Sequence, residues 1–268
     1  MTAQITLISD WNKQDYYVAS VHAAILSDLP KANIINITHN IQSHNIVQAA
    51  FILRAVYKYF PKGSIHIIAI NSETKKDSPH CIVMHNGHYF IGSDNGIFAL
   101  LFGDTPETIV HIHSPNEYSD SSFPELSIFT KLAIFIANGG DILELGIRAN
   151  RVKPATEFEP VIEKNRISGR VIYIDSYGNA ITNISKKIWK EHIDEMPFDL
   201  FINNMNNKIN TIHVKYSDVR AGNLIAIFNS LGLLEIAQRE GNIAQILKLD
   251  TNSEIFAECI LPETGLFT

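Results

Sequence analysis

The chain has 268 residues, of which 46% are hydrophobic and 19% charged, a balance typical of globular proteins rather than disordered ones. Its 22 basic and 28 acidic residues give a formal net charge of -6, which argues against nucleic acid as a partner. No apolar run reaches membrane-spanning length and no secretory signal opens the chain, so we expect a cytoplasmic protein without a membrane partner.

The first half of the chain alternates between strand and helix patterns. Apolar runs predict strands at residues 5–8, 33–37 and 64–70, and helical periodicity predicts helices near 16–28, 45–60 and 126–137. The dipeptide Asn86-Gly87 predicts a hairpin between strands at 81–85 and 88–91. This alternation predicts an α/β domain over residues 1–152, built on a mainly parallel sheet.

The pattern changes near Arg151. Residues 153–168 contain Pro154 and Pro160 and show little periodicity, which predicts a linker. Residues 169–268 are β-rich, which predicts a smaller, β-barrel-like C-terminal domain. Its strands are expected at 169–175, 180–184, 200–202, 211–216, 224–228, 234–237 and 255–261.

Three segments carry side chains suited to a polar ligand. Asp10 follows the first strand, where a carboxylate can accept both hydroxyls of a ribose or cap the next helix. The segment Asp175-Ser-Tyr-Gly-Asn179 offers an amide for an adenine edge and the Tyr177 ring for its face, but its residues also suit an ordinary β-turn. Ser230 precedes a glycine and can bind a carboxylate or belong to a plain hairpin loop.

Several classes of site are not indicated. The chain has 11 histidines and two cysteines, but it contains no HExxH motif and no cysteine pair, so we expect no metal. It also contains no Walker A loop, no GxGxxG after the first strand and no GxSxG motif. Phosphate-loop, dinucleotide-binding and serine-hydrolase interpretations therefore receive no support.

Taken together, several ordered segments resemble the S-adenosylmethionine (SAM) hydroxide adenosyltransferases, which are adenosine-forming SAM hydrolases related to the fluorinase and chlorinase enzymes. The hairpin segment is similar to the family's "PDNG" region, and two later segments match its "YIDxFGNxxTNI" and "NSxGxLEIA" motifs. The matching segments are residues 5–10, 15–18, 37–41, 87–96, 173–184 and 229–237.

The resemblance implies an N-terminal α/β domain, a C-terminal barrel-like domain and a homotrimer with its site at the subunit interface. Water would attack the ribose C5′ of SAM, methionine would leave, and no cofactor would be needed. Asp10 would bind the ribose hydroxyls, Asn179 would read the adenine edge and Tyr177 would lie beside the ring. Asp175 would hold the methionine ammonium group and Ser230 its carboxylate.

The chain departs from the family where the attacking water is handled. The family carries Asp, an Arg seven residues later and a distant His, in "VDPGVGxxRR" and "TFHGRD". Here these positions are Asn71, Ser78 and Pro124, and none of them can act as a carboxylate base. Glu73, Asp77 and Glu125 lie in the same two segments and are the candidate substitutes for the missing base. The alternative, which the sequence favours, is that residues 75–77 form a solvated charged loop and that Glu125 is an ordinary first-turn helix residue.

Two functions therefore remain open. One is an enzyme that transfers the adenosyl group of SAM, or of a related adenosyl compound, to water at a rebuilt site. The other is a non-catalytic sensor or scaffold that binds an adenosyl ligand. A carboxylate directed into the pocket would favour the enzyme, whereas substitute carboxylates that face solvent would favour the binder.

Overall fold

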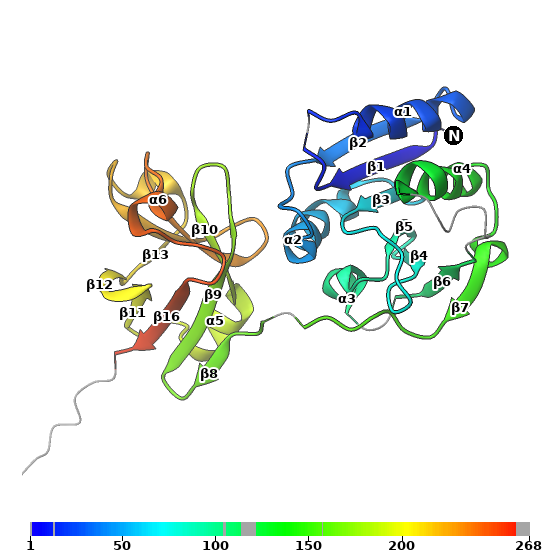
Figure 1. Ribbon diagram of the computed structural model, residues 1–268. Coiled ribbons are helices and arrows are strands. Elements are labelled where there is room, and N and C mark those ends of the chain that lie inside the picture. Colours follow the sequence, from blue (N-terminus) through cyan, green and yellow to red (C-terminus); the bar gives the residue numbers. More distant parts are fainter. Residues whose placement is uncertain (1, 13, 104–105, 114–121, 157, 261–268) are drawn as a thin grey trace, which may run out of the picture. The chain divides into compact units, whose positions relative to one another are not determined.

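The computed structural model describes residues 2–12, 14–103, 106–113, 122–156 and 158–260. It divides into two compact units, Met1–Glu157 and Phe158–Thr268 (Figure 1). The expected linker at 153–168 is shorter in the structure, because strand β8 (Val161–Glu163) pairs with strand β9 (Arg166–Ile174) across the turn at 164–165. All three residues of β8 are exposed, so the sequence there carries no alternation of apolar and polar residues that would reveal a strand.

The N-terminal unit contains a seven-stranded sheet in the order β2-β1-β3-β5-β4-β6-β7. Strands β2, β1, β3 and β5 are mutually parallel, and β6 shares their direction because it is antiparallel to β4, which is antiparallel to β5. The prediction of an α/β unit with a mainly parallel sheet is therefore confirmed. The strands are β1 (Gln4–Ser9), β2 (Asn33–Thr38), β3 (Ile65–Ala69), β4 (His80–His85), β5 (His88–Ser93), β6 (Thr108–Ile112) and β7 (Gly146–Ala149).

Helices cover both faces of this sheet (Figure 1). Strand β3 is buried along its whole length because Ile67 packs with the α1 and α4 side, whereas Ile68 packs with the α2 and α3 side. Burial on both faces explains its continuous apolar sequence. The helices are α1 (Tyr17–Asp28), α2 (Ile46–Val56), α3 (Ile97–Phe102) and α4 (Thr130–Ala137), with a π-helical turn η3 (Glu125–Phe129) directly before α4.

The C-terminal unit is β-rich and barrel-like, as predicted. Its nine-stranded sheet has the order β12-β11-β16-β9-β10-β15-β14-β13, with β8 paired to β9 outside this path. The remaining elements of this unit are β10 (Ala180–Ser185), α5 (Lys186–His192), β11 (Phe198–Ile202), β12 (Asn204–Ile209), β13 (Ile212–His213), η5 (Tyr216–Asp218), β14 (Leu224–Phe228), β15 (Leu233–Gln238), α6 (Ile243–Leu247) and β16 (Glu254–Cys259). No helix in the described part of the chain is long and apolar enough to cross a membrane.

Candidate functional site

The N-terminal unit holds a cavity of ≈ 550 Å³ at the carboxyl ends of β1 and β3. Parallel α/β sheets bind their ligands at this edge, among the loops that follow the strands. Asp10 enters the cavity wall directly after β1, and Asn71 enters it shortly after β3. The described residues lining it are Asp10, Trp11, Asp15, Tyr17, His44, Asn71, Ser72, Glu73, Ser122, Phe123, Pro124 and Glu125.

Asp10 connects two of the loops at this edge. Its Oδ2 accepts a hydrogen bond from the backbone N–H of His44 at 2.8 Å, which ties the end of β1 to the loop before α2. A carboxylate offers about four lone-pair sites, so acceptor capacity remains for ligand hydroxyls. The side chain is only partly exposed, and its position in the cavity wall is compatible with the role that the resemblance implies.

The loop that begins at Asn71 is held by side chains from the neighbouring hairpin. Asn95 donates to the carbonyl of Ile70 at 2.9 Å, and the carbonyl of Ser72 accepts from both His80 Nε2 at 2.8 Å and Ser93 Oγ at 3.0 Å. Asn71 itself has a left-handed φ of 48°, a conformation that asparagine tolerates better than most residues. These anchors give the loop a defined position in the cavity wall.

Glu125 is the buried carboxyl group of the cavity. It is the first residue of η3 and only 5% exposed, although it lines the cavity together with Asp10 and Glu73. Burial raises its pKa above the ordinary value, and the nearby charge of Asp10 adds to the rise. The neighbouring Ser72 hydroxyl partly offsets this effect. A carboxyl group of this kind exchanges protons at a higher pH than an exposed one.

Aromatic rings form another part of the same wall. Trp11 lies 5.4 Å from Phe123 and 5.7 Å from Tyr17, measured between ring centroids, and Tyr17 lies 5.0 Å from Phe123. All three rings line the cavity, and they come from two distant regions of the chain, residues 11–17 and residue 123. Faces of aromatic rings attract cations, so a wall of rings and carboxylates favours a positively charged ligand group.

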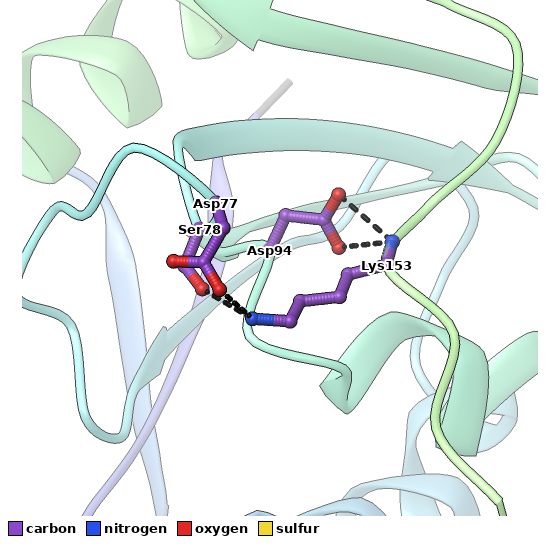
Figure 2. A network of polar contacts seen from close by, with 4 residues as sticks. All are labelled: Asp77, Ser78, Asp94 and Lys153. Carbon is purple, nitrogen blue, oxygen red and sulfur yellow. Dashed lines mark hydrogen bonds and ion pairs between the residues drawn. The ribbon is translucent and has the colours of Figure 1, made fainter.

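Asp77 and Ser78 lie in a different environment. The Lys153 ammonium group donates to Asp77 at 2.7 Å and to the Ser78 hydroxyl at 3.0 Å, and the Lys153 backbone N–H donates to buried Asp94. Figure 2 shows this network of contacts. The Lys153 hydrogen bond and charge hold the pKa of Asp77 below its usual range. Neither Asp77 nor Ser78 is among the described residues that line the cavity. Their contacts with Lys153 instead join the 71–79 loop to residues 151–156.

The C-terminal unit holds a second cavity, of ≈ 800 Å³, beside the turn between β9 and β10. Asp175 organises this turn by accepting N–H groups of Tyr177 and Asn179 at 2.9 Å, and its Oδ2 accepts from the Asn179 amide at 3.0 Å. All three residues line this cavity, with Asn179 buried and Tyr177 76% exposed. An exposed ring beside a buried amide suits a planar ligand that stacks and hydrogen-bonds.

Ser230 lies in the exposed turn between β14 and β15, outside the set of described residues that line this cavity. The turn is shaped by Asn229, whose Oδ1 accepts N–H groups of Leu231 at 3.0 Å and Leu233 at 3.2 Å. The Ser230 hydroxyl thus belongs to a well-defined turn, but these contacts do not place it next to Asp175.

The structure also adds residues that the sequence patterns did not identify. Tyr216 lines the second cavity and donates its hydroxyl proton to buried Glu235, and burial together with this contact raises its pKa far above the usual value. The strand expected at 211–216 ends at β13, because Asp218 accepts N–H groups of Val214 and Lys215 and folds the chain into a helical turn. No local sequence motif identifies Tyr216, because its hydroxyl group bonds to Glu235 of β15, which is distant in the sequence.

Metal-binding geometry is not observed in the described residues: no group of three or more His, Cys, Asp or Glu side chains converges there. The two cysteines, Cys81 and Cys259, are free and buried.

Comparisons with known proteins agree in the fold and in the family. An (R)-S-adenosyl-L-methionine hydrolase of Methanocaldococcus jannaschii is 28% identical, with 94% of each chain covered. A hydrolase of the same name from Thermus thermophilus is 23% identical over 91% of this chain and 95% of its own. The crystal structure of an uncharacterized conserved protein from Thermotoga maritima superposes with a TM-score of 0.83 at 24% identity, covering 96% of this chain and 100% of that one.

Family models match both units separately. The SAM hydroxide adenosyltransferase N-terminal domain matches residues 5–146, and the corresponding C-terminal domain matches residues 169–256. Both cavities lie within these matched regions. The chain therefore belongs to the SAM hydroxide adenosyltransferase family.

Proposed function

We propose that this protein binds SAM, or a closely related adenosyl sulfonium compound, and transfers the adenosyl group to water, giving adenosine and methionine. The observation that carries the proposal is the cavity of the N-terminal unit. Four carboxyl side chains and three aromatic rings line it, and its described lining residues include no lysine or arginine. Carboxylates and ring faces both stabilise a cation, and the reacting centre of SAM is a cationic sulfonium.

The polar groups suit the remaining parts of such a ligand. Asp10 has acceptor capacity for the ribose hydroxyls, and the Asn179 amide with the exposed Tyr177 ring suits adenine. Asp175 accepts three hydrogen bonds and retains about one lone-pair site for the methionine ammonium group, and the exposed Ser230 hydroxyl suits the methionine carboxylate. Because the leaving sulfonium is already cationic, this chemistry requires neither an acid for the leaving group nor a cofactor.

A direct test is incubation of the purified protein with SAM in oxygen-18 water, followed by mass spectrometry. We expect protein-dependent adenosine that carries one heavy oxygen, released together with an equal amount of methionine. SAM that is no more degraded than in a protein-free control would overturn the hydrolytic function.

The alternative is a non-catalytic adenosyl-ligand sensor or scaffold. It is favoured by Asn71, Ser78 and Pro124, which stand where the family carries its Asp, Arg and His and which supply no carboxylate base. Saturable binding of SAM in equilibrium dialysis, without labelled adenosine in the experiment above, would support this alternative over the enzyme.

The proposal includes a homotrimer in which the N-terminal domain of one subunit and the C-terminal domain of a neighbour bind the same ligand. Asp10→Ala and Asp175→Asn should each inactivate the protein, since each removes a charged ligand contact. Random mixed trimers of the two variants should regain about a quarter of the wild-type activity, because a quarter of their sites combine two intact halves. Mixed oligomers without activity, or a monomer in light scattering, would contradict this arrangement.

A further inference from the structure

Glu125 differs from every other carboxyl group that lines the N-terminal cavity. It is 5% exposed, whereas Asp15 and Glu73 are exposed and Asp10 is partly exposed. Ionised carboxylates are rarely buried without a cationic partner, because desolvation is costly. No lysine or arginine belongs to the described cavity wall, so Glu125 has no such partner there. A buried carboxyl kept beside a ligand cavity is typical of proton-transfer sites.

The backbone around Glu125 is well anchored. The N–H groups of Leu126 and Ser127 both donate to the carbonyl of Phe123 at 3.2 Å, which opens the helical segment η3–α4. Phe123 in turn packs against Trp11 and Tyr17 in the cavity wall. The carboxyl group is therefore presented to the cavity from a rigid element, as proton transfer requires.

We propose that Glu125 is the catalytic base of this protein and takes the proton of the attacking water. This inference rests on the proposed function and deepens it. As the water oxygen forms a bond to the ribose C5′, one O–H bond of the water breaks and its proton passes to the Glu125 carboxylate. The C5′–S bond breaks with its electron pair moving to sulfur, so neutral methionine leaves. The protonated Glu125 then releases the proton to solvent, and one SAM cation and one water become adenosine, methionine and a proton.

The other carboxyl groups are less suited to this step. Asp77 is paired with Lys153, which keeps its proton affinity low, and it lies outside the described cavity wall. Glu73 is exposed, so solvent rather than the cavity surrounds most of its side chain. Asp10 is engaged with the backbone N–H of His44 and is assigned to the ribose. A base is most effective when its pKa lies near the working pH, which the buried site of Glu125 favours.

The pH profile provides the distinguishing measurement. Several groups from other elements share the cavity with Glu125: Asp10 after β1, Asp15 and Tyr17 around the start of α1, His44 before α2, and Glu73 after β3. Of these groups, Asp10 disfavours ionisation of Glu125 through its negative charge. We expect kcat to be low in acid, to rise as Glu125 ionises, and to level off at higher pH.

The experiment measures kcat and KM for SAM from pH 4 to 9 in the wild type and four variants, one of which is Asp77→Asn. Glu125→Gln keeps the shape but removes the base, so we expect kcat to fall at least ~100-fold with KM nearly unchanged. Glu125→Asp keeps a carboxylate, so we expect partial activity and a retained acidic limb in the profile. Glu144→Gln makes the same chemical change at an exposed site in this unit and should match the wild type.

The outcomes separate this inference from the function on which it rests. Circular dichroism of each variant first verifies that it is folded. Turnover by the wild type that persists in Glu125→Gln, with an unchanged acidic limb, would overturn the role of Glu125 and leave the hydrolytic function intact. A wild type that binds SAM but produces no labelled adenosine would overturn both. Loss of activity in Asp77→Asn rather than in Glu125→Gln would move the base to the Lys153 network.

Discussion

Replacing Gly178 by alanine is expected to lower the free energy of unfolding of the C-terminal unit by about 3 kcal/mol. Gly178 has a φ of +83°, which disfavours any residue with a Cβ. A Cβ built there lies 2.1 Å from Oδ1 of Asn242 and 2.2 Å from its Cγ. Asn242 is not free to move, because the same Oδ1 accepts the Gln245 N–H at 2.8 Å at the start of α6.

The backbone around Gly178 makes the expected loss larger. The Gly178 carbonyl accepts the N–H of Ala244 at 3.0 Å, so the β9–β10 turn and α6 are held together at this point. Asn242 also lines the second cavity, so its displacement should weaken ligand binding there. The loss of stability should therefore be accompanied by lower affinity for an adenosyl ligand.

Gly222 provides a matched control. Its φ is also +83°, but a Cβ there meets nothing within 4 Å, so Gly222→Ala introduces the backbone strain without the collision. We expect it to cost only about 1 kcal/mol. Urea denaturation followed by Trp189 fluorescence in a Trp11→Phe background reports on the C-terminal unit, since the chain has two tryptophans. Equal losses in the two variants would show that Asn242 yields without cost.

Acid is expected to destabilise the N-terminal unit through His66. This side chain is fully buried on β3, and its pKa falls from 6.5 to about 3, mainly because burial disfavours the charged form and secondarily because of His88. Between these two values the unfolded chain binds a proton that the folded chain does not. The free energy of unfolding therefore has its full value above the unfolded pKa of His66. Below that pKa it falls by about 1.4 kcal/mol for each pH unit.

The loss between pH 6.5 and pH 5 should thus be about 2 kcal/mol. Hydrogen exchange of the β3 and β5 amides measures this loss of free energy in the N-terminal unit. The β9 and β10 amides of the C-terminal unit serve as the reference. His66→Gln should flatten this pH dependence, although it also removes hydrogen bonds of His66 to Thr6 at 2.7 Å and His88 at 3.3 Å. His22→Gln, at an exposed contact with Asn36, should leave the slope unchanged. A slope that persists in His66→Gln would assign the proton uptake to another group.

Much of the fold followed from local patterns in the sequence. The apolar run at 64–70 predicts a strand covered on both faces, and β3 has this environment. The Asn86-Gly87 dipeptide lies between β4 and β5 with positive φ at both residues, as a tight hairpin requires. Such features depend on residues a few positions apart, so they can be inferred without the tertiary structure.

The linker and the strand expected at 211–216 show where local patterns were insufficient. Strand β8 is exposed and β13 has only two residues, so neither produces an apolar–polar alternation long enough to recognise. Both are defined by their partners, β9 and β14. Pairing between strands depends on the rest of the sheet rather than on the strand's own sequence.

The candidate sites divide in the same way. Short segments of the sequence were enough to predict the two-part α/β and β-rich organisation, the family resemblance and the clustering of Asp175, Tyr177 and Asn179. The burial of Glu125 in the cavity wall and the pairing of Asp77 with Lys153 outside the described wall could be seen only in the folded structure. Burial and charge depend on side chains brought together from distant segments, and these determine which carboxyl group can act as a base.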